Sequence, residues 1–291
     1  MRTVSMPLGM LLGALFCRQV EFLDELCNHL ITPAMIVTML FFNFCRVNLR
    51  SMRPSIMYVW LFAFQIFGAI VLYYSLVAFD ETIAQGAMVC VLAPIAMAAV
   101  VIGTMLGAAV EKMVTYTLLC NIGTALFAPI VLTLTGNGDC TFMQIASRIV
   151  PLLIVPFVVA QFCRFTMPSV AQWFASHSQL SFYIWLLSLV VIIGKTVSFV
   201  LDFGAAQRLT TVLLALIAGV ICVVQFAVGE AIGRKYGDES AGRQALGQKN
   251  TIMAVWMAQS FLNPLACIAP TAYIVWQNIV NSYQIYKRSR K

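Results

Sequence analysis

The sequence predicts an all-α polytopic membrane protein, and its composition and its apolar blocks support that prediction. The chain of 291 residues is 61% hydrophobic and only 10% charged, with a mean hydropathy of +0.90. Soluble domains carry roughly a quarter charged residues, so this chain lacks the polar side chains that a water-facing surface needs. Its apolar residues form blocks of about 20, the length at which a helix crosses a bilayer core. A soluble enzyme is therefore excluded, and residues 1–291 are predicted to form a single membrane domain.

Ten blocks account for nearly the whole chain. In order, the expected spans are 4–18, 28–45, 55–78, 83–107, 113–134, 142–163, 180–201, 207–233, 241–260 and 264–286. The connections between them are short and leave no room for a soluble domain. The first span is short, but Phe16 stands where a cleaved signal peptide needs a small residue, so we expect a retained helix.

The charged residues predict the orientation in the membrane. With the N-terminus in the cytoplasm, 13 of the 18 Lys and Arg residues fall on the cytoplasmic side, and only Arg18 and Arg208 on the outer side. The cytoplasmic set is Arg2, Arg46, Arg50, Arg53, Lys112, Arg164, Arg234, Lys235, Arg243, Lys287, Arg288, Arg290 and Lys291. The outer loops carry Glu21, Asp24, Glu25, Asp80, Glu81, Asp139 and Asp202. Because cytoplasmic loops of membrane proteins are enriched in Lys and Arg, both termini are expected in the cytoplasm.

Ten spans divide into two halves of five, residues 1–139 and residues 140–291. Since five is odd, the second half begins on the opposite side of the membrane, and the halves are predicted to form an inverted repeat. Spans 4 and 9 occupy equivalent places, and both are interrupted, by Pro94 and by the polar run Gly247–Asn250. Matched broken helices indicate a binding site near the middle of the bilayer. For Pro94 alone, a simple helix kink is the alternative.

Lys249 is the basic residue that is hardest to place in lipid. Its neighbours in the sequence are also polar: Gln248, Asn250 and Thr251. A lysine in hydrocarbon costs a few kcal/mol on insertion scales, so we expect Lys249 to face a cavity or a partner. Arg148 and Lys195, the other basic residues clearly within spans, lie about two turns from a helix end and are expected to extend to the membrane surface.

Two polar residues of span 5, Thr117 and Asn121, lie one turn apart and share a helix face. An asparagine in lipid costs free energy, so this face is expected to point into the protein. The two histidines, His29 and His177, are far apart, and we assign them no chemistry. The nine cysteines contain no C-x-x-C pair and are interpreted as buried free thiols, so no metal site is expected.

Motifs of catalysis and of ATP hydrolysis are absent from the sequence. It contains no G-x-S-x-G, no H-E-x-x-H, no pair of aspartates inside spans and no P-loop. The chain is therefore not expected to be an enzyme or to hold a cofactor. The net charge of +7 is attributed to cytoplasmic loops rather than to nucleic-acid binding, and no protein partner is predicted.

The ends of both halves contain short motifs. They are Gly247-Gln248-Lys249-Asn250, Leu262-Asn263-Pro264-Leu265-Ala266 and Val275-Trp276-Gln277-Asn278-Ile279, together with the stretch from Ala93-Pro94 to Ala128-Pro129. These segments, about a quarter of the chain, resemble the fourth, fifth, ninth and tenth helices of the bile acid:sodium symporter family. The resemblance implies ten spans in two inverted repeats, with a panel of spans 1, 2, 6 and 7 that rocks against a core of the other six.

The chain departs from that family at the residues that bind sodium. Ala245 stands where the family has a glutamate ligand, and Lys249 where it has a glutamine. The Ser-Asn pair of the family's fourth helix falls on Ala99 and Val100, which have no side-chain oxygen. A hard cation needs oxygen ligands, so most of the sodium site is lost and a fixed cation stands at the same place.

The expected function is secondary active transport of small organic anions by alternating access, independent of sodium because the Lys249 ammonium takes the sodium position. The substrate is expected between Lys249 and the N-terminal ends of the half-helices after Pro94 and Asn250, with Ala96 and Thr251 beside it. The expected ion site comprises Lys249, Gln248, Thr117 and Asn121, of which the last two align with family ligand positions. Burial disfavours the charged form of a lysine, so a proton is a candidate coupling ion beside sodium.

Two alternatives remain open at this stage. One is sodium-coupled symport of organic anions or bile acids, and the other is a non-transporting membrane sensor on the same fold. Saturable tracer flux would distinguish a transporter from a sensor. The expected location is a bacterial inner membrane, which is an inference from size and single-membrane design.

Overall fold

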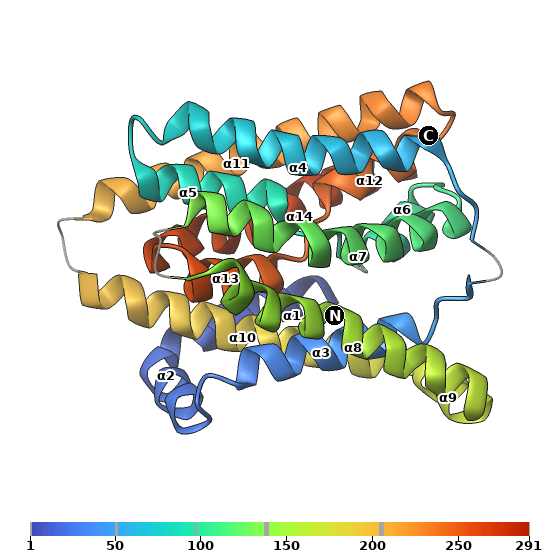
Figure 1. Cartoon of the computed structure of the whole chain (residues 1–291), viewed down its shortest axis with the longest axis horizontal. Coiled ribbons are helices and arrows are strands. Elements are labelled where there is room, and N and C mark those ends of the chain that lie inside the picture. The colour runs from blue at the N-terminus through green and yellow to red at the C-terminus, as the bar shows by residue number, and fades with distance from the viewer. Residues whose placement is uncertain (1, 50–51, 97, 137–139, 204–206, 291) are drawn as a thin grey trace. The chain divides into compact units, whose positions relative to one another are not determined.

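A computed structural model describes residues 2–290 apart from 50–51, 97, 137–139 and 204–206 (Figure 1). Arg50, Asp139 and Lys291, which enter the charge count above, lie outside the described residues. The described residues form helices and no strand. The α-helices are α1 Arg2–Leu15, α2 Cys17–Leu26, α3 Ile31–Phe44, α4 Ile56–Leu76, α5 Glu81–Leu92, α6 Ala98–Met105, α7 Val110–Thr135, α8 Phe142–Thr166, α9 Pro168–Ser176, α10 Ser178–Phe203, α11 Arg208–Lys235, α12 Glu239–Gly247, α13 Thr251–Phe261 and α14 Ile268–Ser289, and a 3₁₀ turn, η3, covers Pro264–Cys267.

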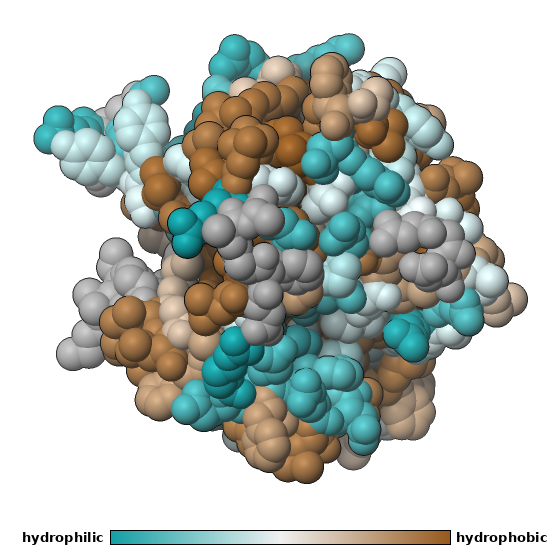
Figure 2. Space-filling view, turned by 90° about the vertical axis from the view of Figure 1, so that its left-hand side faces the viewer, coloured by the Kyte–Doolittle hydropathy of each residue, from teal (hydrophilic) through white to brown (hydrophobic). Residues whose placement is uncertain are grey.

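Five helices are long and apolar enough to cross a bilayer: α4, α7, α8, Tyr183–Leu201 of α10, and α11. The pair α2 and α3, bent by 86°, makes a sixth span if it is counted as one. Large apolar side chains remain exposed on these helices, such as Phe67 at 67% and Val220 at 62%, and Figure 2 shows apolar side chains open on the surface. Such an apolar surface is favourable in the hydrocarbon core of a bilayer. The chain is therefore an all-helical integral membrane protein.

Of the ten expected spans, five or six are supported by the length and hydropathy of the helices. The remaining four expected spans correspond to α1, to α5 with α6, to α12 with α13, and to α14. These helices do not meet the same criterion of length and hydropathy. The interruptions expected in spans 4 and 9 are nevertheless present, because α5 ends at Leu92 before α6 begins at Ala98, and α12 ends at Gly247 before α13 begins at Thr251.

The chain forms two compact units, and each is discontinuous in sequence. Unit 1 comprises residues 1–47 and 147–209, and unit 2 comprises residues 48–146 and 210–291. Unit 1 thus contains the segments expected as panel spans 1, 2, 6 and 7, and unit 2 those expected as core spans 3–5 and 8–10. Each unit draws on both halves of the chain, so neither half folds as a separate body.

In unit 1, α1 and α2 lie along α10 at three glycines. Gly9 faces Leu186, Gly13 faces the backbone of α10 near Val190, and Gly194 faces Val20. Since hydrogen replaces a side chain at these points, the helices approach closely, as small residues allow in membrane proteins.

The C-terminal end of α3 is closed by α8 of the same unit. Gln161 Nε2 donates to the carbonyl oxygen of Phe44 at 3.2 Å, and Arg164 Nη1 donates to that of Cys45 at 2.8 Å. Carbonyls at a helix C-terminus have no partner within the helix, and a basic side chain there is favoured by the helix dipole.

In unit 2, α11 and α12 approach each other backbone to backbone. A Cβ on Gly242 would collide with the carbonyl oxygen of Gly229, and a Cβ on Gly229 would collide with that of Gly242. Both helices therefore depend on the missing side chains. Gly68 of α4 is a contrast, because a Cβ there would meet its nearest neighbour, Val91, at an ordinary 3.7 Å.

We expect Gly242→Ala to lower the free energy of unfolding and Gly68→Ala to leave it unchanged or slightly raised. Overpacking in a close-packed interior costs about 1–3 kcal/mol, and the Gly242 neighbour is rigid backbone. Thermal unfolding of both purified variants in one detergent measures the difference. Equal melting temperatures for the two variants would contradict the close approach of α11 and α12.

Candidate functional site at the helix crossing

The two helix interruptions of unit 2 meet and are joined by backbone hydrogen bonds. Ala96 N donates to the carbonyl oxygen of Gln248 at 2.9 Å, and Asn250 N donates to that of Pro94 at 2.8 Å. The two bonds form an isolated antiparallel bridge in which Ile95 lies opposite Lys249. Pro94 ends α5 because it disfavours helical geometry in the residue before it. The crossing thus pairs backbone groups that two broken helices would otherwise leave open inside a membrane protein.

Lys249 lies between α12 and α13, and its side chain caps the C-terminal end of α5. Its Nζ donates to the carbonyl oxygens of Val91, at 2.8 Å, and Ala93, at 3.0 Å. The residue is 1% exposed. The last carbonyls of a helix lack partners within the helix and carry the negative end of its dipole, so an ammonium is stabilised there. A lysine ammonium has three N–H donors, and one remains for a further partner.

Two buried glutamines hydrogen-bond to the other two free carbonyls at the C-terminal end of α5. Gln65 of α4 donates to the carbonyl oxygen of Leu92 at 2.7 Å, and Gln225 of α11 donates to that of Cys90 at 3.2 Å. Gln225 also donates to Tyr273 Oη at 3.1 Å, and that hydroxyl donates to the carbonyl oxygen of Gly247 at 2.9 Å. The carbonyls of residues 90–93 therefore each accept a bond from a side chain. Through Tyr273, the same hydrogen bonds connect the end of α5 to Gly247, the last residue of α12.

Side-chain amides connect α12 to one face of α14. Gln277 Oε1 accepts a hydrogen bond from Lys249 N at 3.1 Å, and Asn281 Nδ2 donates to Gln248 Oε1 at 2.5 Å. Gln244 Nε2 donates to Asn281 Oδ1 at 2.9 Å and to Gln284 Oε1 at 3.1 Å. Residues 277, 281 and 284 recur at helical spacing and so share one face of α14. Hydrogen bonds from this face of α14 therefore fix the position of the backbone at Gln248 and Lys249.

The structure brings most of the expected site residues together. Pro94 and Ala96 contact Gln248 and Asn250 through the bridge, while Asn250 Oδ1 also caps α13 by accepting from Met253 N at 3.3 Å. Thr251 is the first residue of α13 and is buried.

Thr117 and Asn121 make no described hydrogen bond to the crossing. Thr117 Oγ1 donates to the carbonyl oxygen of Met113, and Asn121 Nδ2 donates to that of Thr117, both at 2.7 Å within α7. The prediction that they face the protein interior is confirmed, since both are at most 1% exposed. Asn121 Oδ1 has no partner among the described residues.

An apolar groove with a volume of about 410 Å³ lies on unit 2 and is open to the surface. Its lining from α4 and α7 is apolar and aromatic and includes Phe62, Phe67, Tyr116 and Cys120. Cys120 Sγ donates to Gln65 Oε1 at 3.1 Å. The Gln65 side chain therefore lies between Cys120, at the edge of this groove, and the Leu92 carbonyl at the end of α5.

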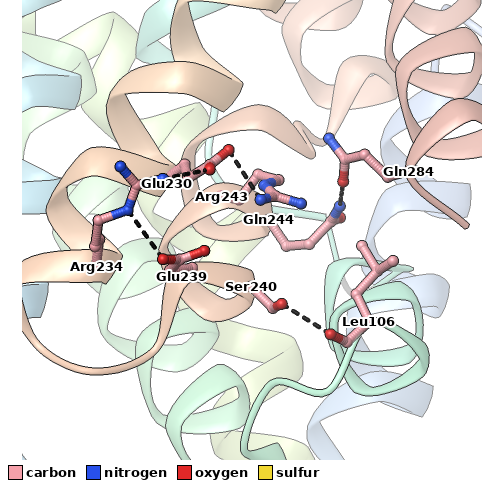
Figure 3. A network of polar contacts seen from close by, with 8 residues as sticks. All are labelled: Leu106, Glu230, Arg234, Glu239, Ser240, Arg243, Gln244 and Gln284. Atoms are coloured by element: carbon pink, nitrogen blue, oxygen red, sulfur yellow. Dashed lines mark hydrogen bonds and ion pairs between the residues drawn. The ribbon is translucent and has the colours of Figure 1, made fainter. Parts of the chain in front are cut away.

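The N-terminal ends of α5 and α12, which lie away from the crossing, have similar structures. Asp80 and Asp238 are N-caps of α5 and α12, and each accepts from the backbone N–H three residues later. Each is followed by Glu and a hydroxyl residue, Thr82 or Ser240. Thr82 Oγ1 accepts from Asn263 Nδ2, between α13 and α14, at 3.0 Å. Ser240 Oγ donates to the Leu106 carbonyl, between α6 and α7, at 2.8 Å (Figure 3).

An ion network surrounds the start of α12, and the described residues at the start of α5 form no similar network. Arg234 pairs with Glu230 and Glu239, and Arg243 pairs with Glu230, each at 2.9 Å (Figure 3). The Glu230–Arg234 pair has the i,i+4 spacing that favours contact on a helix surface. These contacts fasten the end of α11 to α12.

Sequence reasoning missed the glutamines, Tyr273 and Asn281. A usable signal was present for Gln65 and Gln225, because each is a single amide in an otherwise apolar span, and such groups seek hydrogen-bond partners within the protein. The Asp-Glu-Thr and Asp-Glu-Ser triplets were a second missed signal of similarity between the halves.

Lys195, which was expected to extend to the membrane surface, pairs with a residue that was expected in an outer loop. Its Nζ lies 2.7 Å from Asp24 Oδ2 in unit 1, and its side chain is 18% exposed. Asn263 is the N-cap of η3, since its Oδ1 accepts from Leu265 N at 3.0 Å, and this 3₁₀ turn precedes α14.

A comparison with protein-family models and a search of curated proteins found no match to this chain. The function is therefore argued from the residues of the crossing themselves.

We expect Gln65→Leu to destabilise the protein measurably. Leucine keeps the volume but leaves the buried carbonyl of Leu92 without its side-chain donor, and an unsatisfied buried polar group costs about 1–3 kcal/mol. The matched control is Gln172→Leu, since Gln172 is exposed on α9. Thermal unfolding in the same detergent compares them, and a Gln65→Leu variant as stable as wild type would contradict the capping role.

Proposed function

We propose that the protein is a secondary active transporter of small organic anions that works without sodium. One observation carries the proposal: the Lys249 side chain is bound to the open carbonyl end of a broken helix inside a membrane unit. Carbonyls at the ends of half-helices are where transporters coordinate coupling cations. In this chain a covalently attached cation occupies that kind of position.

The hydrogen bonds at the end of α5 support independence from sodium. The carbonyls of residues 90–93 already accept bonds from Gln65, Gln225 and Lys249. A hard cation requires several oxygen ligands at short distance. Sodium would have to displace Lys249 or a glutamine before those oxygens could coordinate it.

The half-helices that leave the crossing support an anionic substrate. Helix α13 begins at Thr251, directly after the bridge, and its first N–H groups carry the positive end of its dipole. Helix N-termini of this kind bind anionic groups. The fixed charge of Lys249 adds to the same field.

Two features support alternating access within an inverted repeat. The chain has two compact units that can serve as the two bodies of a rocking mechanism. The matched N-caps at Asp80 and Asp238, with matched contacts to the opposite half, are what two related halves would produce. Ten spans with cytoplasmic termini and a likeness to bile acid:sodium symporters belong to the same proposal.

We expect no sodium-specific stabilisation of the purified protein. A ligand at 100 times its dissociation constant stabilises the native state by about 2.7 kcal/mol, so a sodium site of useful affinity would be visible. Thermal unfolding in sodium and in potassium at matched ionic strength makes the comparison. A sodium-specific rise in melting temperature would contradict the role given to Lys249 and favour sodium-coupled symport.

We expect Lys249→Gln to abolish saturable uptake, because glutamine lacks the fixed charge. The assay follows radiolabelled pyruvate, pantoate and taurocholate into proteoliposomes, with and without sodium. Lys287→Gln, a change at an exposed lysine of α14, is the control and should retain uptake. Uptake unchanged in Lys249→Gln would refute the mechanism, and no saturable uptake of any anion by wild type would favour a non-transporting sensor.

A further inference from the structure

Unit 1 contains a buried ion pair that the proposed function does not use. Lys195 Nζ of α10 lies 2.7 Å from Asp24 Oδ2 of α2, and the Asp24 side chain is 1% exposed. Lys195 belongs to the apolar span Tyr183–Leu201. Ionised side chains are rare at such depth because they cost free energy, so a pair of them is a candidate functional site.

A histidine connects this buried carboxylate to the surroundings. His29 Nδ1 lies 2.9 Å from the same Asp24 oxygen, and the histidine side chain is 68% exposed. The other carboxylate oxygen, Oδ1, is buried and has no partner among the described residues. A proton on His29 Nδ1 can pass along its contact with Asp24 Oδ2, and the exposed imidazole can take up another proton at Nε2.

The same aspartate fastens a strained corner of the backbone. Helices α2 and α3 meet at 86°, and Asn28 and His29 between them have φ values of 52° and 59°. Left-handed backbone costs an ordinary L-residue roughly 1–2 kcal/mol, although asparagine and histidine adopt it more readily than most. His29 N donates to the Asp24 carbonyl oxygen at 2.8 Å. Asp24 thus holds His29 through both its backbone and its carboxylate.

The other charged groups nearby are paired elsewhere or exposed. On α2, Arg18 lies 3.6 Å from Glu21, and both contact Ser198 of α10, while Glu25 is exposed. Helix α3 has no charged residue. The remaining charged residues of α1 and α10 are Arg2 and Asp202, whose side chains are not described. Among the described side chains, Lys195 and His29 are the basic groups that face the Asp24 carboxylate.

We propose that Asp24, His29 and Lys195 form a proton-binding site that controls the corner between α2 and α3. A proton from water binds Nε2 of His29, and the proton on Nδ1 passes to Asp24, which leaves a neutral imidazole and a carboxylic acid. The acid no longer balances the charge of Lys195, so the ion pair that holds α2 on α10 is lost. The strained corner is then free to relax. For transport, which rests on the proposed function, the proton is the ion that gates the anion cycle.

Cys27 is a native reporter for this corner, because it is exposed directly after α2. The experiment places a nitroxide label on Cys27 in the full-length protein in phosphatidylcholine–phosphatidylglycerol nanodiscs, with Cys140 and Cys163 replaced by serine. Spin-label mobility is recorded from about pH 5 to pH 8.5. We expect mobility to rise as the pH falls, because a proton taken up at His29 reaches Asp24 and breaks its pair with Lys195.

Variants at the site identify the group responsible. His29→Gln should abolish the transition, and Asp24→Asn should hold the label in its mobile state at every pH. The matched control is His177→Gln, which removes the chain's other histidine and should leave the transition unchanged. If Asp24→Asn does not fold, His29→Gln alone decides, since its side chain is largely exposed. A wild-type label without a transition, or a transition that survives His29→Gln, would overturn the proposal.

Uptake assays keep this proposal separate from the proposed function. If transport of the three test anions shows pH dependence that His29→Gln removes, the proton site gates transport. If the label titrates but no anion is taken up at any pH, the proton site stands and the proposed function fails. If uptake is pH-dependent in His29→Gln as in wild type, the gating role is refuted.

Discussion

Unit 2 depends on one requirement: no backbone carbonyl at a broken helix end can remain unpaired inside a bilayer, where water is not at hand. Breaking α5 at Pro94 exposes the carbonyls of residues 90–93, and three side chains from different parts of the chain are directed at them. Lys249 supplies two of the four bonds, which explains why a charged group is tolerated at that depth. The bridge between Ile95 and Lys249 and the amides of α14 follow from the same requirement, because they position the lysine backbone.

The two units solve the problem of buried polarity differently. Unit 2 spreads it over several amides and the ammonium of Lys249, so removal of one amide donor leaves a local defect. Unit 1 concentrates it in the Asp24–Lys195 pair, where a single proton changes the balance of charge. Neutral networks favour rigidity when every member is satisfied, whereas a paired charge responds to its surroundings.

Sequence patterns predicted what depends on local chemistry. Helical class, membrane insertion and the interruptions at Pro94 and Gly247–Asn250 follow from hydropathy and from proline geometry. The burial of Lys249 followed from its polar neighbours. Its carbonyl partners, Val91 and Ala93, lie more than 150 residues away in sequence, and no local rule places them. The partner of Lys195, Asp24, is also distant in sequence, and no local rule pairs the two. The role of each site residue in binding stays a prediction.

The covalent attachment of the cation at the crossing has a consequence for energetics. A co-transported ion leaves with its substrate and offsets the substrate's charge, but in the proposed transport cycle the Lys249 side chain would return with the protein. A monovalent anion carried alone would therefore move one net charge across the membrane. A potential of 100 mV is worth about 2.3 kcal/mol for each charge moved. With lysine in place of sodium, membrane voltage rather than a sodium gradient would set the direction in which anions accumulate.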